Sequence, residues 1–398
     1  MTYAMAGVDV AAGDRAVELM KDEIKATFND TVLAQDGGFA GLVDASALRG
    51  MSKPLLATST DGVGTKVAIA QQTGIHHTIG QDLVGMVVDD IVVVGAKPLF
   101  MTDYIACGRV DPEVIAQIVG GIARACASID TPLIGGETAE HPGLMGLDEY
   151  DVAGAATGVV DAADVLGAAR VREGDAVIGL ASSGLHSNGY SLVRRVFADA
   201  DWDYDRAVPE LTGPDGSPET LAEALLIPTR LYTTVCLDMA RAGRLAARDW
   251  DGDEAAVLSE AAVGTVTPSG LHALSHVTGG GLGANLCRVI PAGLMAHVDR
   301  STWQVPAMFG LVGDLGRVPM DDLEATLNMG IGMVAIVDER FAEDAIALSA
   351  AQGIVAWRIG RVESSLKPPE GARIIAGMKG SSGGGVALSG NYRSSSGS

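Results

Sequence analysis

The sequence predicts a two-domain α/β protein with mixed (α+β) sheets, and three observations lead to that prediction. The chain has 398 residues, too many for one ordinary core, and its 47% hydrophobic content can fill two. Strand-like and helix-like segments alternate in both halves. A connector at 162–175 follows the strand-like segment 150–161. We therefore place an N-terminal domain at 1–165 and a C-terminal domain at 166–365.

Local patterns define the elements in order. The chain opens with a helix-like segment at 14–27, and mixed strands and helices follow it. After the connector, "AVIGLASS" (176–183) is typical of a buried strand and "SNGYSLVRRVFADA" (187–200) of a helix. The end, 366–398, is rich in Gly and Ser and lacks an apolar period. We expect it to be a disordered tail.

Composition excludes several classes of partner and location. The formal charge is −22, and the 28 Lys and Arg are scattered, which argues against nucleic acid and anionic lipid. The longest apolar runs, such as 83–96, contain acids and fall short of the roughly 18 residues of a membrane span. No signal peptide is recognised. The cysteines lack a CxxC pair and favour a reducing compartment, so we expect a cytoplasmic protein; they are Cys107, Cys126, Cys236 and Cys287.

The segment "ATSTDGVGTKVAIA" (57–70) places an acid, two glycines and a lysine between two apolar runs. Asp-Gly between apolar runs is a strong hairpin signal. The segment does not match the Walker pattern, so it does not by itself indicate a phosphate loop. Asp61 and Lys66 at this spacing could instead hold a divalent cation and the phosphate oxygens that it bridges. The segment alone leaves both interpretations open.

Three acids interrupt the apolar segment 80–98, namely Asp82, Asp89 and Asp90. As a helix, the segment is apolar enough to be core. Burying carboxylates costs several kcal/mol unless cations compensate them. A partly exposed acidic stripe is one interpretation, and a buried Mg²⁺ site explains the acids better.

The segment "TPLIGGETAEHPG" (131–143) is an apolar run that stops at Gly-Gly-Glu. Glycines let a backbone approach a ligand closely, and Glu137 would lie at a strand end, where ligands of open α/β sheets gather. The alternative is an ordinary exit from a strand into a loop.

Two Gly- or Ser-rich loops of the second half, 182–193 and 277–290, run into helix-like segments. Backbone N–H groups at helix starts bind phosphate without net positive charge, which suits so acidic a protein. His186 and Asn188 add a titratable group and an amide to the first loop, unless they are ordinary surface residues.

The second loop also matches a dinucleotide-binding pattern, GxGxxA, which gives an alternative interpretation. The strand-like segment 268–277 before it contains a proline and two histidines, which makes it a poor central parallel strand. His272 and His276 lack an HExxH context, so structural roles are favoured over zinc. The matching positions are Gly279, Gly281, Ala284 and Asp299.

Taken together, the motifs resemble one family, aminoimidazole ribonucleotide synthetase, also called phosphoribosylformylglycinamidine cyclo-ligase. The resemblance covers almost the whole chain up to about Val362. The ordered matches include "YAMAGVDVAAGDRAVELMK", "STDGVGTK", "HTIGQDLVGMVVDDIVVVGAKP", "GGETAEHPG", "SSGLHSNGYSLVR", "HVTGGGLGANLCRVIP" and "TLNMGIGM".

The resemblance implies a fold and a reaction. It implies a homodimer whose N-terminal domains pair their sheets into a shared β-barrel, each followed by a C-terminal α/β domain with glycine-rich loops. It implies ATP as co-substrate and Mg²⁺, and it leaves a monovalent cation open. The reaction would close the imidazole ring of formylglycinamidine ribonucleotide in de novo purine biosynthesis, with release of ADP and phosphate.

The resemblance also implies site residues. The family commonly has Asn at position 89 and Pro at position 185, and neither departure removes a proposed ligand. The implied metal ligands are Asp61, Asp90 and Glu137; the implied nucleotide and phosphate contacts are Asp61, Gly62, Gly64, Thr65, Lys66, Gly279, Gly280 and Gly281; the implied catalytic set is His186, Asn188 and Lys21, the last also an ATP-phosphate contact.

The residues fit this chemistry independently. An amide oxygen is a poor leaving group, and its phosphorylation by ATP turns it into phosphate, after which ring closure is intramolecular. His186 could transfer the proton. Three rival interpretations are a kinase of the thiamine monophosphate kinase type, a dehydrogenase that binds NAD, and a metabolite-binding protein without catalysis.

Overall fold

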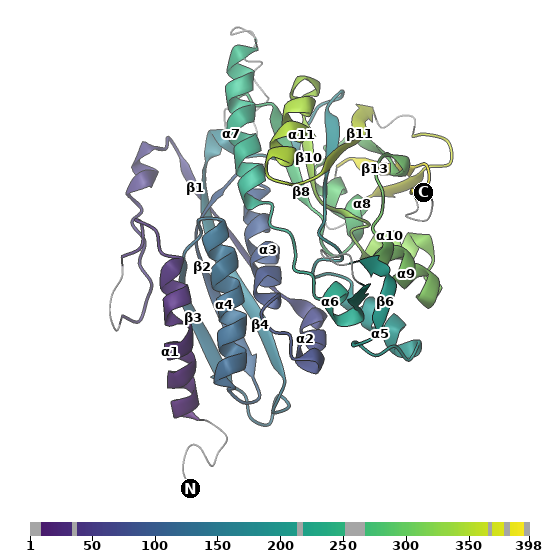
Figure 1. Cartoon of the computed structure of the whole chain (residues 1–398). Helices are drawn as coiled ribbons and strands as arrows, with labels where there is room; N and C mark the ends of the chain where they lie inside the picture. Colours follow the sequence, from purple (N-terminus) through teal and green to yellow (C-terminus); the bar gives the residue numbers. More distant parts are fainter. Residues whose placement is uncertain are drawn as a thin grey trace.

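The computed structural model describes residues 9–33, 38–212, 218–250, 267–364, 368–377 and 383–393. Two sheets organise these residues (Figure 1). The first sheet ends at Asp161 and the second begins at Ala176, so the boundary predicted at 165/166 lies between them. Among the described residues, no helix combines the length and apolar character needed to cross a membrane.

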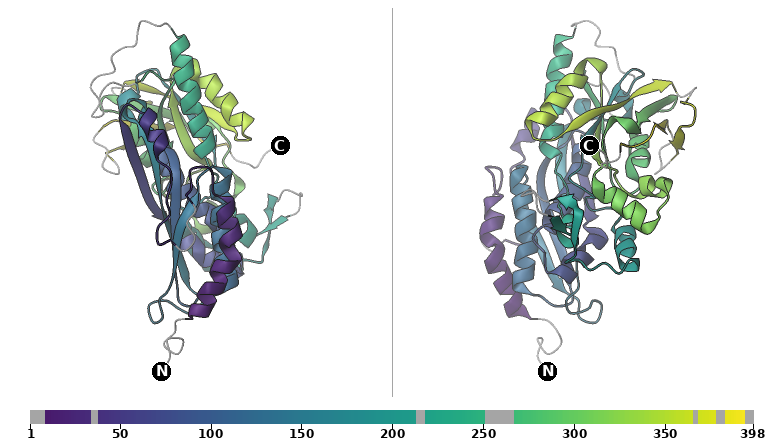
Figure 2. Two further views of the ribbon diagram at one scale, coloured as in Figure 1. Left: turned by 90° about the vertical axis from the view of Figure 1, so that its left-hand side faces the viewer. Right: turned by 45° about the vertical axis from the view of Figure 1, so that its right-hand side comes forward.

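The N-terminal domain is a four-stranded sheet in the order β1-β4-β2-β3, with β2 and β3 parallel and the other pairs antiparallel. Helices α1, α3 and α4 cover one face, and no helix of the described residues covers the opposite face (Figures 1 and 2). The bounds are α1 Val10–Ala26, β1 Pro54–Gly62, α2 Val67–Thr73, α3 Ile79–Val92, β2 Lys97–Cys107, α4 Pro112–Ser128, β3 Leu133–Glu140 and β4 Tyr150–Asp161.

Side-chain alternation explains this arrangement. Met101 and Ile105 of β2 are fully buried on the helix-covered face, as a period of two requires. Tyr104, which points to the opposite face of β2, is 42% exposed, and Leu56 of β1 is 66% exposed. The uncovered face of the sheet therefore carries apolar side chains.

The C-terminal domain is built on a seven-stranded sheet in the order β12-β13-β9-β11-β5-β10-β8. In the described part of this sheet, β13 and β9 pair in parallel and the other neighbouring strands are antiparallel. The main bounds are β5 Ala176–Ala181, α5 Tyr190–Asp199, α7 Thr233–Asp249, β8 Leu271–His276, α8 Gly281–Leu286, β9 Leu294–Asp299, α9 Ala307–Gly316, α10 Met320–Thr326, β10 Ile331–Val337, α11 Ala342–Ala351, β11 Ala356–Ser364, β12 Arg373–Ala376 and β13 Gly385–Ser389. A small hairpin, β6 (Ala207–Thr212) and β7 (Pro218–Thr220), precedes the short helix α6 (Leu221–Leu225).

The prediction of a disordered tail is wrong for the described part of 366–398. Strands β12 and β13 extend the second sheet, and Val386 and Leu388 are buried in it. The apolar run "GVALS" in an otherwise Gly- and Ser-rich stretch is enough to form a strand because β9 offers an edge for pairing.

The fold also rules out the dinucleotide pattern. Strand β8 pairs antiparallel with β10 at the edge of the sheet, and α8 has only 6 residues. Strand β9 lies beside β11 and β13, so β8, α8 and β9 form no unit of adjacent parallel strands. A Rossmann site requires such a unit.

Candidate active site between the domains

The segment that follows β1 is a loop that turns into a helix, so the hairpin interpretation is wrong. A single 3-10 turn, Gly64–Lys66, leads directly into α2. Gly64 has φ +75°, a left-handed conformation that favours glycine.

This loop contacts the first glycine-rich loop of the C-terminal domain. The Ser187 hydroxyl donates to the Val63 carbonyl at 2.6 Å, and the Thr65 and Ser191 hydroxyls lie 3.2 Å apart. Two of the motifs predicted to bind ligands are therefore adjacent across the domain boundary.

Asp82 is fully buried, and groups of the protein itself compensate the negative charge of its carboxylate. Its Oδ1 accepts from the Lys66 ammonium at 2.9 Å, and from the Thr229 N–H and hydroxyl at 2.8 and 2.7 Å. Burial raises the pKa of Asp82 and lowers the pKa of Lys66, and the attraction between the two opposes both shifts. Asp82 and Lys66 thus form an internal ion pair through Oδ1, while Asp82 Oδ2 has no hydrogen-bond partner among the described residues.

Asp89 is compensated in a similar way, by donors from the start of α7. The Tyr232 N–H and the Thr233 hydroxyl donate to its carboxylate at 3.0 and 2.8 Å. Burial raises the pKa of Asp89 to about 6. Donors of the chain compensate Asp89 without Mg²⁺. Asp82 Oδ2 has no hydrogen-bond partner among the described residues, so the interpretation of these acids as part of a Mg²⁺ site stays a prediction.

Asp90 is different, because its side chain is 39% exposed. Its Oδ1 lies 2.9 Å from His276 Nδ1, at the end of β8. Partial burial raises the pKa of Asp61, with the charge of Asp90 acting in the same direction and His276 in the opposite one. Asp61 and Asp90 thus lie close enough to repel each other, as two ligands of one cation would.

The predicted third ligand, Glu137, lies elsewhere in the single chain. It is on β3, while Asp61 is on β1 at the other edge of the sheet. The register runs from Asp61 through Gly154 and Asp103 to Gly136, so three strand spacings of about 4.8 Å, roughly 14 Å, separate the two edges. Among the described residues, no three His, Cys, Asp or Glu side chains are placed to hold a metal.

Lys21 also lies away from this group. It is on α1, which packs on α4, and its ammonium pairs with Glu18 at 2.5 Å. That bond raises the pKa of Lys21. The single chain therefore brings neither Lys21 nor Glu137 to the other predicted residues.

The second glycine-rich loop is shaped by its neighbours. Gly280 and Gly281 have φ +100° and +69°, and a Cβ on Gly281 would lie 1.7 Å from the Glu324 carbonyl oxygen. The Asn285 amide donates to the carbonyl of Gly281 at 2.8 Å and fixes the turn. Backbone conformation and close packing both require glycine here.

Asn188 joins the loops to α3. Its Nδ2 lies 3.2 Å from Met86 Sδ, and a Cβ on Gly279 would lie 3.3 Å from its Oδ1. The predicted pair of Asn188 and the Gly279–Gly281 loop is thus brought together in the structure.

His186 is buried, with 1% exposure, and has φ +64°. Its Nε2 accepts from the Ser183 N–H at 3.1 Å, which places the proton on Nδ1. Nδ1 has no hydrogen-bond partner among the described residues. Burial, with His276 and Lys66 nearby, lowers the pKa of His186 well below its ordinary value. His186 is therefore a neutral N–H donor at neutral pH.

An interdomain pocket of about 320 Å³ opens beside Asp90 and His276. Asn285 and Arg288 line it from α8 and the turn after it, and 166–168 of the connector line the opposite side. Sequence reasoning treated His276 as structural and gave Asn285 and Arg288 no role. The signal for His276 is spatial, because Asp90 lies 186 positions away.

Comparison with known families agrees with this architecture. The sequence profile of the AIR synthase related protein N-terminal domain matches residues 43–160, and that of the C-terminal domain matches 172–249 and 253–368. The chain belongs to the AIR synthase related family. Both glycine-rich loops of this family member fall inside the matched ranges.

Curated relatives of this AIR synthase related protein share one name. The chain is 42% identical to the phosphoribosylformylglycinamidine cyclo-ligase of Alkaliphilus oremlandii over 92% of its own length and 98% of the relative. It is 44% identical to that of Sorangium cellulosum over 95% and 99%. The one from Desulfitobacterium hafniense is 44% identical over 84% and 89%.

Solved structures share the fold of this family member at low identity. A thiamine-monophosphate kinase from Stenotrophomonas maltophilia has TM-score 0.61 and 17% identity, covering 94% of this chain and 97% of that one. The hydrogenase maturation protein HypE in complex with ATP has TM-score 0.59 and 17% identity, covering 97% of each chain. These likenesses show the fold alone.

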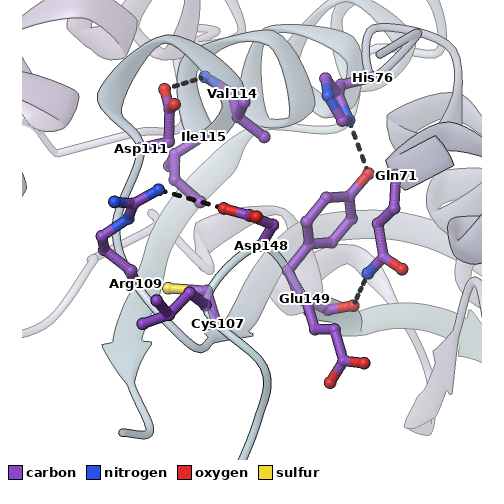
Figure 3. Close-up of a pocket in the computed structure, with 11 residues that line it drawn as sticks. Gln71, His76, Cys107, Arg109, Asp111, Val114, Ile115, Asp148 and Glu149 are labelled. Carbon is purple, nitrogen blue, oxygen red and sulfur yellow. Dashed lines mark hydrogen bonds and ion pairs between the residues drawn. The ribbon is translucent and has the colours of Figure 1, made fainter. Parts of the chain in front are cut away.

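A second pocket of this AIR synthase related protein lies at the far end of its first sheet (Figure 3). The Gln71 amide donates to the Tyr150 carbonyl at 2.8 Å, and His76 Nδ1 lies 2.8 Å from the Tyr150 hydroxyl. Arg109 pairs with Asp148 at 3.1 Å. None of the predicted site residues lines this pocket, and its polar groups are largely paired with one another.

Proposed function

We infer that this chain closes the imidazole ring of formylglycinamidine ribonucleotide to give aminoimidazole ribonucleotide, with release of ADP and phosphate. It is an ATP-dependent cyclo-ligase of purine biosynthesis. The observation that carries the inference is identity of 42–44% to proteins of that name over 92% and 95% of the chain. The convergence of the two glycine-rich loops and two carboxylates between the domains supports it.

The reaction has two steps in this proposal. The formyl amide oxygen attacks the γ-phosphorus of ATP, and the P–O bond to ADP breaks. The neighbouring amidine nitrogen then attacks the formyl carbon and loses its proton, and the C–O bond to that carbon breaks with inorganic phosphate as the leaving group. The second step is intramolecular, so a site that holds the two nitrogen arms in register removes much of its entropic barrier.

The chain's residues divide this work. In this proposal Gly62, Gly64 and Thr65 lie on the ATP side, and the loop Gly279–Gly281, where α8 begins, lies against a phosphate. Asn188 orients the reacting amide from between the two loops. The neutral His186 donates from Nδ1 to an oxygen that gains negative charge.

Asp61 and Asp90 are the residues that would hold Mg²⁺. Two carboxylates suit a magnesium ion whose remaining ligands are phosphate oxygens and water. Bound there, the ion would neutralise charge on the transferring phosphoryl group. The roles of Glu137 and Lys21 stay predictions, and a monovalent cation is assigned no residue.

A homodimer is part of the proposal. The helix-free face of the first sheet carries Leu56 and Tyr104, 66% and 42% exposed. A second copy would cover these apolar side chains by closing two four-stranded sheets into one barrel.

One incubation tests the function. With ATP, Mg²⁺ and formylglycinamidine ribonucleotide, we expect aminoimidazole ribonucleotide, ADP and phosphate in equal amounts. Asp90→Asn should lower kcat by about 10²-fold or more, because the charge that binds the ion is lost, while Asp344→Asn, at an exposed site on α11, should retain full activity. A stable phosphorylated product without ring closure would identify a kinase, and no ATP turnover would identify a binding protein.

A further inference from the structure

Lys66 is a buried cation with all of its donors in use. Its ammonium donates to Asp82 Oδ1 at 2.9 Å, to the His186 carbonyl at 2.9 Å and to the Ile227 carbonyl at 2.8 Å. The residue has no exposed surface. A lysine has three N–H donors, so this set satisfies it completely.

This placement argues against the predicted contact between Lys66 and the ATP phosphates. To reach a phosphate, the ammonium would have to leave Asp82, which has no exposed surface either. A buried carboxylate without its cation is strongly unfavourable, even with the Thr229 donors in place. The role of Lys66 therefore lies in the three hydrogen bonds that it already makes.

The bond to His186 falls on a strained residue. His186 has φ +64°, which is costly for a residue with a Cβ and persists only where surroundings hold it. The Lys66 ammonium donates to the His186 carbonyl. The next residue, Ser187, is held in turn by the hydrogen bond from its hydroxyl to the Val63 carbonyl. With the carbonyl fixed, the ring accepts from the Ser183 N–H and Asn188 lies against Gly279.

We propose that Lys66 is a positioning residue, which reaches from the first domain to fix the backbone of the 186–188 loop in the second and does not contact ATP. The bonds to Asp82 and Ile227 anchor the ammonium between α3 and the segment before α7. Lys66 thereby couples the ATP side of the site to the side that orients the amide. The activity readout of this inference rests on the proposed function.

The main test is the variant Lys66→Met/Asp82→Asn, which removes both charges of the pair and keeps a side chain that can bond to Thr229. We expect kcat to fall about tenfold or more, because the amide-orienting loop is no longer fixed. The Kd for ATP should stay within about threefold of the wild type. Thr233→Val is the matched control, because it removes a bond between the domains at Asp89 and leaves the 186–188 loop alone; it should keep kcat.

A second readout does not need turnover. The protein has 7 histidines, and the ¹⁵N imidazole signal of His186, assigned with His186→Gln, should shift in Lys66→Met/Asp82→Asn and not in Thr233→Val. An unchanged kcat with an unchanged His186 signal would overturn the proposal. So would a Kd for ATP raised tenfold or more while the His186 signal stays in place.

The wild-type protein supplies a third measurement, in case the double variant does not fold. Lys66 should resist acetylation by acetic anhydride both with and without ATP, because it is buried in either state. Labelling without ATP and protection by ATP would identify a phosphate contact. A wild-type chain that does not make aminoimidazole ribonucleotide would refute the proposed function only, since the His186 signal and the acetylation pattern still decide the role of Lys66.

Discussion

Gly136 is a glycine of the "GGET" motif that close packing within the protein requires. A Cβ at this position would lie 2.2 Å from Asp103 Oδ1, on the neighbouring strand β2. The glycine of the "GGET" motif therefore makes room for a buried carboxylate. The sequence left open a close approach to a ligand or an ordinary exit from the strand, and the structure places Gly136 inside β3 against a neighbouring strand.

Asp103 itself should make stability depend on pH. Burial raises its pKa to about 7 from 3.8. The folded protein therefore binds this proton more tightly than the unfolded chain, so the free energy of unfolding should fall as pH rises from about 4 through 7. Asp103→Asn should remove this dependence and stabilise the protein at pH 8 by about 1–3 kcal/mol. Urea unfolding at pH 5 and pH 8 measures it; an equal change at both pH values would contradict it.

At the scale of residues, the sequence indicated which side chains to consider for the site but not which groups they contact. The structure brings Asp61, Lys66, Asp90 and Asn188 to the region between the domains, and their roles there stay predictions. The sequence could not predict that Asp82 accepts from Thr229, because 147 positions separate the two and only the packing of α3 on the second domain brings them together. Sequence patterns reveal local periodicity, whereas polar contacts between domains join residues far apart in the chain and leave no periodic pattern.

At the scale of elements, α3 and the C-terminal strands differ most from expectation. The apolar segment 80–98 was considered as a buried helix, and its first part forms α3, which ends at Val92, while Lys97 begins β2. Two of the acids of α3, Asp82 and Asp89, accept hydrogen bonds from the segment before α7 and from the start of α7, and the third, Asp90, lies beside His276. The tail was misjudged because glycine content hid a short strand whose stability comes from pairing with β9.

The tail should support the second glycine-rich loop through α10. Glu324 is 4% exposed and accepts from Arg300 at 2.9 Å, from Arg373 at 2.8 Å and from the Tyr392 hydroxyl at 2.8 Å. Its main-chain carbonyl lies against Gly281. Burial alone would raise the pKa of Glu324, and these donors outweigh it and lower the pKa below 4.5.

Glu324→Gln should therefore destabilise the protein by about 3 kcal/mol at pH 7, because the partly buried Arg300 loses its counter-charge and the partly buried Arg373 keeps only Asp321 among the described acids. The contribution of the carboxylate is present above its unfolded pKa and is lost as pH falls through the lower folded pKa, so the difference from wild type should shrink toward pH 3. Asp322→Asn, exposed on the same helix, is the control. A loss that does not vary with pH would show that volume or shape, not charge, is responsible.

At the scale of the molecule, the two domains meet where the predicted loops lie. The order of motifs was enough to predict an N-terminal and a C-terminal unit, because each has its own alternation of apolar segments. Their docking was not predictable from periodicity, since it depends on single polar contacts such as Ser187 with Val63. The position of Glu137 on the edge strand β3 was likewise hidden until the strand order was known.

The strand order leads to the last prediction, which concerns the helix-free face. A sheet with one face on the core and Leu56 66% exposed on the other is incomplete as a monomer. We expect sedimentation to give twice the 40.7 kDa mass of the chain. Leu56→Glu should shift the protein to a single chain, because a charge would be buried without a partner in the barrel. Leu245→Glu, at a site 55% exposed on α7, should leave the mass unchanged. A wild type that sediments as one chain, or a Leu56→Glu variant that keeps the double mass, would place the interface on another face.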